Sequence, residues 1–406
     1  MRLKIPGLLI ACLVPAACDR GVDARGSSVV RDSADVRIVE STAPAWDSAS
    51  AWRVADTPSV VIGVEDGPPE YLLDNVKAAV RLSGGRIAVA NGGTGEIRIY
   101  AAAGEHAATL GRRGSGPGEF EGLDRLWAAG GDTLIAYDAI QRRFTVFAPD
   151  GRVAATLPLP VVEGRPGATL LLGRFADGSV LVKAGAELSP DTREGLDRRE
   201  ATYARAALDG SPVRKLGSFF DGEAYYVKDG PGVSAYARPF APAPQTAVGG
   251  DAFYYSAADA FEVRRFRPDG RLEAVFRKRQ EPVAVTDEDV REYREQMLEG
   301  VSGPDRARLE RVLASIPFPD RKPAHGRMLV DAEGSLWVLE TKADDDPRFR
   351  WSVFDPDGVW LGTVEVPAGF RVLEVGADYV LGVRQAPDTG IEEVRVYPLR
   401  KPEAGE

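Results

Sequence analysis

Few side chains of this 406-residue chain are suited to acid–base or metal chemistry. It contains two His and two Cys, so a His-rich metal site or a Ser-His-Asp relay would have to use His106 or His325. His325 is a candidate general base because an imidazole changes charge near neutral pH. No nucleophile or carboxylate partner stands near it in the sequence, which favours a hydrogen-bonded structural role.

Side-chain oxygens offer a second candidate site. Asn91 and Asp138 each end a short apolar run, and a ring of such oxygens could hold Ca²⁺, which needs no His ligand. The alternative, which we favour, is that both side chains cap local turns. The run from Asp344 to Asp346 lacks the spaced ligands of a Ca²⁺ loop and is typical of a solvated loop.

A Gly-rich segment, GRRGSGPGEF at residues 111–120, contains the third candidate. Its Arg112 and Arg113 could clamp a carboxylate or sulfate, with Glu119 close by in the sequence. Arg residues in Gly-rich loops also serve for solvation alone, and that interpretation is favoured. The candidate ligand-binding residues are therefore Arg112, Arg113, Glu119, Asp138 and His325.

The composition excludes several classes of protein. Two Cys are too few for a disulfide scaffold. The 51 Lys and Arg against 61 Asp and Glu give a net charge of -10, so the average field repels phosphate and no nucleic-acid partner is predicted. The 44% hydrophobic fraction is that of an ordinary folded protein.

The first 18 residues, MRLKIPGLLIACLVPAAC, have a basic start, an apolar run and small residues before a Cys. This pattern indicates a secretory signal, and it resembles a bacterial lipoprotein signal, in which the Cys becomes the acylated N-terminus. We expect residues 1–17 to be removed and Cys18 to carry lipid. Pro15 departs from the usual lipobox, so cleavage by ordinary signal peptidase near Ala17 is the alternative. Residues 18–35 are predicted to be a flexible tether.

Such a signal predicts that the protein is exported to the bacterial cell envelope, anchored in a membrane and facing the periplasm or the exterior. The body after the signal contains no further Cys. Cys18 is therefore expected to serve only the attachment.

The body of the chain is a sixfold repeat. Short apolar runs follow a Gly or Asp turn at residues 84–90, 130–136, 176–182, 249–255, 332–339 and 376–383. Each is followed by a second run, and five of these end in a Gly turn, three of them PDG. Four short strands per repeat predict an all-β, six-bladed β-propeller of antiparallel blades.

The predicted domain covers residues 36–406 as one propeller. Its blades are expected at about 76–110, 121–157, 168–217, 245–276, 326–365 and 370–399. The last blade lacks a fourth strand, and the apolar run at 59–64 should supply it and close the ring. Residues 36–41 are expected to add a strand or to lie along the side of the ring.

Loop lengths indicate which face binds. The first and third turns of each blade are short, whereas the other connections are long and emerge on the opposite face. The longest should hold a helical hairpin at about 286–315, between blades 4 and 5, starting with a capping box from Thr286 to Asp289. A lid and a brace are equally compatible with this hairpin.

Residues 89–120 resemble the NHL repeat of β-propellers. VANGGTGEIRIYAAAG, at 89–104, and the Gly-rich segment that follows carry the likeness. The whole chain is similar to poorly characterised exported six-bladed propellers of bacteria. That resemblance implies the fold and topology but no general activity. Other six-bladed relatives, such as gluconolactonase-like lactonases and amidating lyases, bind a metal at the centre of the disk.

The favoured function is a non-enzymatic, monomeric binding module that takes a protein, peptide or glycan on its long-loop face, with no cofactor. The alternative is a Ca²⁺-dependent hydrolase or lactonase with its site in the central channel. Three or more oxygen ligands converging on the axis would favour the enzyme. An apolar or Arg-lined channel would favour the binding module.

Overall fold

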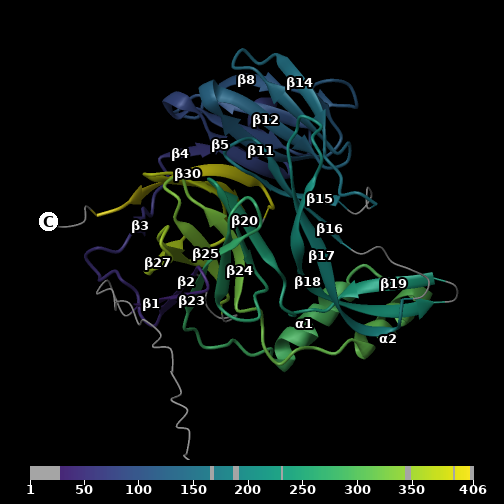
Figure 1. Ribbon diagram of the computed structural model, residues 1–406. Helices are drawn as coiled ribbons and strands as arrows, with labels where there is room; N and C mark the ends of the chain where they lie inside the picture. The colour runs from purple at the N-terminus through teal and green to yellow at the C-terminus, as the bar shows by residue number, and fades with distance from the viewer. Residues whose placement is uncertain are drawn as a thin grey trace, which may run out of the picture.

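The computed structural model describes residues 28–164, 169–185, 192–229, 232–342, 349–386 and 389–402. These residues form mainly β-strands, with two α-helices (Figure 1). Cys18 and the run from Asp344 to Asp346 lie outside the described residues. No helix in the described part is both long enough and apolar enough to span a bilayer.

Most strands belong to six sheets, which lie in the sequence at the positions of the six repeats. Sheets 1 to 3 are formed by strands β5 (Val76–Arg81), β6 (Ile87–Asn91), β7 (Glu96–Tyr100) and β8 (His106–Leu110); β11 (Leu123–Ala129), β12 (Thr133–Asp138), β13 (Arg143–Phe147) and β14 (Val153–Pro158); and β15 (Thr169–Arg174), β16 (Val180–Gly185), β17 (Gly195–Ala206), β18 (Arg214–Asp229) and β19 (Gly232–Ala237). The two-residue strands β9 (Arg112–Arg113) and β10 (Glu119–Phe120) pair with each other between sheets 1 and 2.

The other three sheets include strands from the N-terminal segment. Sheets 4 to 6 are formed by β20 (Gln245–Gly249), β21 (Ala252–Ser256), β22 (Glu262–Phe266) and β23 (Leu272–Lys278) with β1 (Ser28–Ser33) and β2 (Val36–Ser41); β24 (His325–Val330), β25 (Leu336–Glu340), β26 (Phe349–Phe354) and β27 (Trp360–Val366); and β28 (Phe370–Val375), β29 (Tyr379–Gln385) and β30 (Glu392–Arg400) with β3 (Arg53–Val54) and β4 (Val60–Ile62).

Short turns join the third and fourth strands of several sheets. The PDG turns place Gly151, Gly270 and Gly358 at φ of 82°, 87° and 91°, a region that only Gly occupies without strain. In the first of these turns the Asp150 carboxylate accepts a hydrogen bond from the N–H of Arg152 (3.1 Å). The turn chemistry of the sequence therefore sets where each antiparallel pair reverses.

The six sheets form a closed ring in the described part of the chain. Each of six hydrophobic clusters combines side chains of two sheets that follow one another, and one cluster joins sheet 6 back to sheet 1 through Ile62, Val76 and Val394. The first strands lie innermost: β5 contacts β11 and β28, and β20 contacts β15 and β24. The core is thus divided among the gaps between sheets rather than gathered at one centre.

The N-terminal segment fastens three sheets together. Strand β2 pairs in parallel with β23 of sheet 4, Trp46 packs against sheet 5, and β4 pairs with β30 of sheet 6. The apolar run at 59–64 therefore lies beside the last repeat, where the sequence places it. Of the expected flexible tether, residues 28–33 instead pair with residues 36–41 as a β-hairpin. Residues 18–27 lie outside the described residues.

Two helices stand in the connection between sheets 4 and 5. Helix α1 (Asp287–Leu298) begins with the predicted capping box, in which Thr286 and Asp289 exchange hydrogen bonds. Helix α2 (Gly303–Ser315) buries Val312 and Leu313, and these pack with Tyr225 of β18. The hairpin rests on the part of β18 that extends beyond the ring (Figure 1), which is the arrangement of a brace.

Candidate functional site

The two faces of the ring differ in their connections. In sheet 1 the first residue of β5, Val76, pairs with the last residue of β6, Asn91. The innermost strand therefore starts at the face with the long connections and ends at the short first turn. We call the former the long-loop face and the latter the short-turn face. The helical hairpin and the extensions of β17 and β18 lie on the long-loop side.

A cavity of about 450 Å³ lies among the innermost strands. Residues from all six sheets line it, which identifies it as the central channel of the ring. The charged side chains in its wall are Lys77, Arg125, Arg174, Lys183, Arg327 and Glu374. Five cations from four sheets thus face one carboxylate, although the whole chain has a net charge of -10.

Four of these cations lie near the long-loop end of the channel. Lys77, Arg125 and Arg327 are the second or third residues of their strands, and Lys183 pairs with Leu170, the second residue of β15. The ladder register shifts between Val76 and Ala78, between Leu123 and Arg125, and between His325 and Met328. Bulges of this kind re-aim side chains and are common beside binding sites. Here they place Lys77 and Arg327 as bulge residues at the channel mouth.

Arg327 lies close to two other cations. Its Nη1 donates a hydrogen bond to the carbonyl oxygen of Val372 on the neighbouring sheet (2.9 Å), and no carboxylate within the described residues forms an ion pair with it. Desolvation by the surrounding walls, followed by repulsion from Arg125 and Arg371, lowers the pKa of Arg327 to about 10. It remains charged at neutral pH. An anion in the channel would relieve this unfavourable field.

Two other cations of the wall have carboxylate partners. Lys183 pairs with Asp221 (2.5 Å) and Arg125 with Asp124 (3.1 Å). Arg371 lies beside Arg327 and donates to the carbonyl oxygen of Val76. These contacts hold the cations at the walls of the channel.

The charges at the short-turn end of the channel nearly balance. Arg174, the last residue of β15, has a buried Nε with no hydrogen-bond partner among the described residues, and burial lowers its pKa. Glu374 accepts hydrogen bonds from the Tyr379 hydroxyl and the Arg81 backbone N–H, and burial raises its pKa. The positive charge therefore gathers at the long-loop mouth.

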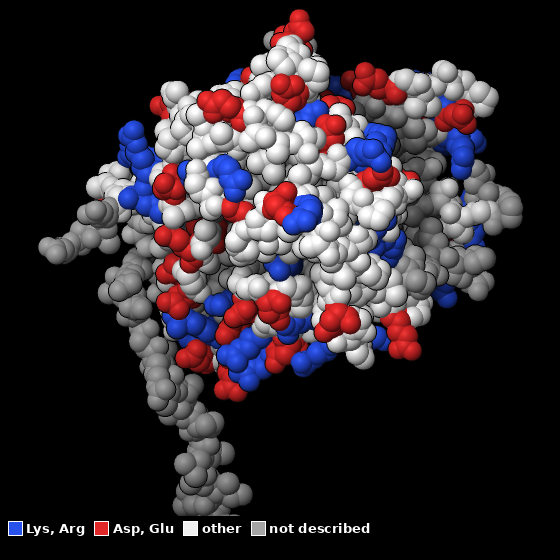
Figure 2. All heavy atoms as spheres, turned by 90° about the horizontal axis from the view of Figure 1, so that it is seen from above, with Lys and Arg blue, Asp and Glu red and all other residues white. Residues whose placement is uncertain are grey.

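The face of the molecule seen in Figure 2 has no such separation of charge. Figure 2 shows basic and acidic side chains interspersed over the face seen there. The cation group in the channel is thus a local feature that the net charge conceals.

Asp138 is fully buried, and backbone groups occupy its carboxylate. One oxygen accepts the N–H groups of Glu121 and Gly122 (2.7 and 3.1 Å), and the other accepts those of Ile140 and Gln141 (2.9 and 2.8 Å). It therefore ties the entry of sheet 2 to the turn after β12, as the turn-capping interpretation expects.

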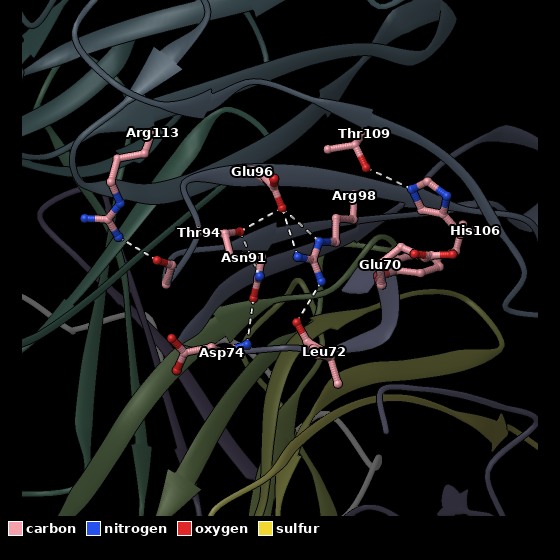
Figure 3. A network of polar contacts seen from close by, with 12 residues as sticks. Glu70, Leu72, Asp74, Asn91, Thr94, Glu96, Arg98, His106, Thr109 and Arg113 are labelled. Atoms are coloured by element: carbon pink, nitrogen blue, oxygen red, sulfur yellow. Dashed lines mark hydrogen bonds and ion pairs between the residues drawn. The ribbon is translucent and has the colours of Figure 1, made fainter. Parts of the chain in front are cut away.

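Asn91 has the matching role in sheet 1 (Figure 3). Its Oδ1 accepts the N–H of Asp74 (2.8 Å), and its Nδ2 donates to the Thr94 hydroxyl (2.9 Å). Thr94 in turn donates to Glu96, which pairs with Arg98 (2.9 Å). Within the described residues, no group of three His, Cys, Asp or Glu side chains is arranged to hold a metal ion.

The Gly-rich segment folds back on itself. Glu119 pairs with Arg112 (2.6 Å) and accepts the N–H of Gly116 (2.8 Å), and these bonds hold the pKa of Glu119 below its usual value. Arg113 donates to the carbonyl oxygen of Gly93 (2.5 Å; Figure 3). None of the three lines the central cavity, so the structure does not bring them together with the channel cations.

His325 is 1% exposed. Its Nδ1 lies 2.9 Å from the carbonyl oxygen of Gly326 and therefore donates to it, so Nε2 accepts the Ser256 hydroxyl (2.7 Å). The ring packs on Phe261. Burial lowers the pKa of His325. It joins sheets 4 and 5 as a neutral ring rather than lining the central cavity.

Acid should weaken the fold through His325. Below about pH 6.5 the imidazole of His325 takes up a proton in the unfolded chain but stays neutral in the folded protein, because burial disfavours its charged form. The free energy of unfolding therefore falls as pH drops from 7 towards 5, with a slope of up to about 1.4 kcal/mol per pH unit. His325→Asn should remove that part of the slope in urea denaturation across this range. The matched His106→Asn, at a partly exposed His, should leave the slope unchanged. Equal slopes for wild type and His325→Asn would contradict the assignment.

Sequence reasoning missed the channel cations, although a signal existed. A basic residue stands second or third in the first strand of four repeats, at Lys77, Arg125, Arg327 and Arg371. The buried pair of Lys278 and Glu340, from sheets 4 and 5, was also missed. A smaller hollow of about 380 Å³ lies beside Lys278, at the base of the helical hairpin. It involves only one side of the ring.

Comparison with known proteins gives no family. No protein-family model matches the sequence, and no curated protein is significantly similar to it. Solved structures with a similar course of the chain include an exported protein of Bacteroides fragilis (12% identity; 90% of this chain and 100% of that chain; TM-score 0.48). A second is a virginiamycin B lyase of Staphylococcus aureus (10% identity; 79% of this chain and 94% of that chain; TM-score 0.38). A third is a gluconolactonase of Xanthomonas campestris (15% identity; 81% of this chain and 88% of that chain; TM-score 0.40). Likeness at this level does not transfer an activity.

Proposed function

We propose that this protein is an exported, membrane-tethered, six-bladed β-propeller that binds an acidic ligand in its central channel without catalysis. The ligand enters from the long-loop face, and its negatively charged group lies among Lys77, Arg125, Lys183 and Arg327. Cys18 carries the lipid anchor. The ligand is an acidic peptide side chain or an acidic sugar presented by a protein, peptide or glycan.

The closed ring of six sheets supports the propeller arrangement. Six clusters of apolar side chains join consecutive sheets, and strand β4 completes sheet 6 beside β30. The innermost strands then converge on one axis, where a binding group can receive side chains from every sheet.

The observation that carries the function is the uncompensated positive charge of the channel. Arg327 lies near Arg125 and Arg371 and has no carboxylate ion pair within the described residues. Charged N–H donors in a partly enclosed site favour a carboxylate, phosphate or sulfate. They repel a divalent cation, so the wall chemistry favours the binding module over the Ca²⁺-dependent hydrolase. A volume of about 450 Å³ has room for one acidic side chain or one sugar acid.

Titration calorimetry on the purified mature chain tests this function. We expect heat and saturation with glucuronate and succinate but none with their neutral counterparts, glucose and succinamide. Because exposed charges are screened, affinity should fall as NaCl rises from 10 to about 150 mM.

Metal analysis and a thermal shift with EDTA complete the test. A bound metal at one equivalent with a lowered Tm in EDTA, or the absence of binding by every acid in the panel, would overturn the proposal. The first outcome would instead support the hydrolase alternative.

A further inference from the structure

The topology of the N-terminal hairpin determines from which face the chain leaves the ring. Strand β23 is the fourth strand of sheet 4 and ends at the long-loop face with Lys278. Strand β2 runs parallel to it, with Ser41 level with Lys278. Strand β1 runs antiparallel to β2, with Ser28 opposite Ser41. Ser28 therefore lies at the long-loop end of the rim.

Hydrogen bonds and an ion pair hold the hairpin of β1 and β2 on sheet 4 and thereby fix the position of Ser28. Strand β1 pairs with β2 along its full six residues, and Ser28 is 2% exposed, with its hydroxyl 2.8 Å from that of Ser41. Glu40 bonds Arg277 of sheet 4 (2.6 Å). Figure 1 shows β1, β2 and β23 side by side. Since β1 runs towards the short-turn face, the chain enters β1 at its long-loop end.

The distance between this exit and the proposed anchor is limited by covalent geometry. Ser28 is the tenth residue after Cys18, and a fully extended chain of ten residues spans at most about 36 Å. The edge of the ring at β1 is about 20 Å high from the long-loop face to the short-turn face, because β1 has six residues. If the short-turn face lay against the membrane, the chain would first have to cover the full height of the ring edge between Ser28 and that face. This would use more than half of the maximum distance that the chain from Cys18 to Ser28 can span.

We propose that the long-loop face, with the cationic mouth of the channel, is turned towards the membrane that carries the anchor. This inference rests on the lipid anchor in the proposed function. The acidic ligand then reaches the channel through the space between the disk and the bilayer. The helical hairpin and the extended β18 lie in the same space, and the short-turn face points away from the membrane.

Energy transfer from single dyes to the bilayer tests this orientation. The body has no native Cys, and the acylated Cys18 does not react, so one engineered thiol labels one position. Ala139→Cys places the dye on the exposed turn after β12, on the long-loop face. Ala103→Cys places it on the exposed turn between β7 and β8, on the short-turn face. The lipidated chain is reconstituted in vesicles that carry an acceptor dye on the lipid headgroup.

We expect higher transfer efficiency from position 139 than from position 103. Insertion of ten Gly/Ser residues before residue 27 should reduce the difference, because a longer tether frees the disk. Equal transfer in the unmodified chain, or higher transfer from 103, would overturn the orientation. Mass spectrometry that finds no lipid on Cys18 would overturn it as well. Calorimetry with glucuronate on the same preparation reports the channel separately, so either proposal can fail without the other.

Discussion

Replacing Arg327 with Gln is expected to weaken binding of an acidic ligand by about ten- to a hundredfold. A hydrogen bond to a charged group contributes about 1.5–3 kcal/mol, and each 1.4 kcal/mol corresponds to a tenfold change in affinity. Arg327 lies at the mouth of the channel without a carboxylate partner within the described residues. The substitution removes one positive charge from beside Arg125 and Arg371. The fold should therefore lose little stability, which separates lost binding from misfolding.

Calorimetry with glucuronate or succinate checks this result, together with a melting curve of each variant. Arg152→Gln is the matched control, because Arg152 pairs with Asp150 on an exposed turn outside the cavity and its side chain is 86% exposed. It should bind as the wild type does. If Arg327→Gln and Arg152→Gln bind equally well, the ligand does not lie in the channel.

Replacing Lys278 with Met is expected to cost about 3 kcal/mol of unfolding free energy. The Lys278 side chain is 7% exposed, its ammonium bonds Glu340 and the Ser352 hydroxyl, and it lies 4.3 Å from the Trp360 ring. Without it, Glu340 keeps its burial but loses its counter-charge, which is the costly way to break a buried pair. The same loss removes the interaction that now holds the pKa of Glu340 below its usual value against burial.

Urea denaturation measures this cost, and a double variant isolates its cause. Lys278→Met with Glu340→Leu removes both charges and should recover most of the lost stability. Arg350→Met, at the more exposed pair Arg350 and Glu365, should cost at most about 1 kcal/mol. If the double variant is no more stable than Lys278→Met, the ion pair is not the source of the loss.

Local patterns of the sequence sufficed for much of the secondary structure. Turns of Gly and Asp mark where the strands reverse, and the capping box at Thr286 marks the start of α1. Both signals depend on residues close together in the chain. The hairpin of β1 and β2 was not predicted, because Ser28 to Asp35 is polar and short. Its pairing depends on the edge that β23 offers, 237 residues further along the chain.

The channel could not be predicted in the same way. Lys77, Arg125 and Arg327 stand in different repeats, so their shared position becomes visible only when the first strands of the repeats are aligned. The candidates that the sequence did single out, such as Asp138 and Arg112, proved to be engaged in turns and loops of their own. Asp138 is bound by backbone N–H groups, and Arg112 pairs with Glu119 of its own loop, so neither side chain is available to a ligand in the channel.

The sequence by itself determined the strands, the turns, the repeat and the helical insertion, because each follows from periodicity and from the φ preferences of neighbouring residues. Only the tertiary structure decided which side chains share the axis and from which face the chain leaves the ring. Those facts follow from strand register and bulges, which shift a side chain by one position and thereby turn it into or away from the channel. Register depends on partners far along the chain, so Arg327 meets Arg125 and Arg371 only after the ring is assembled.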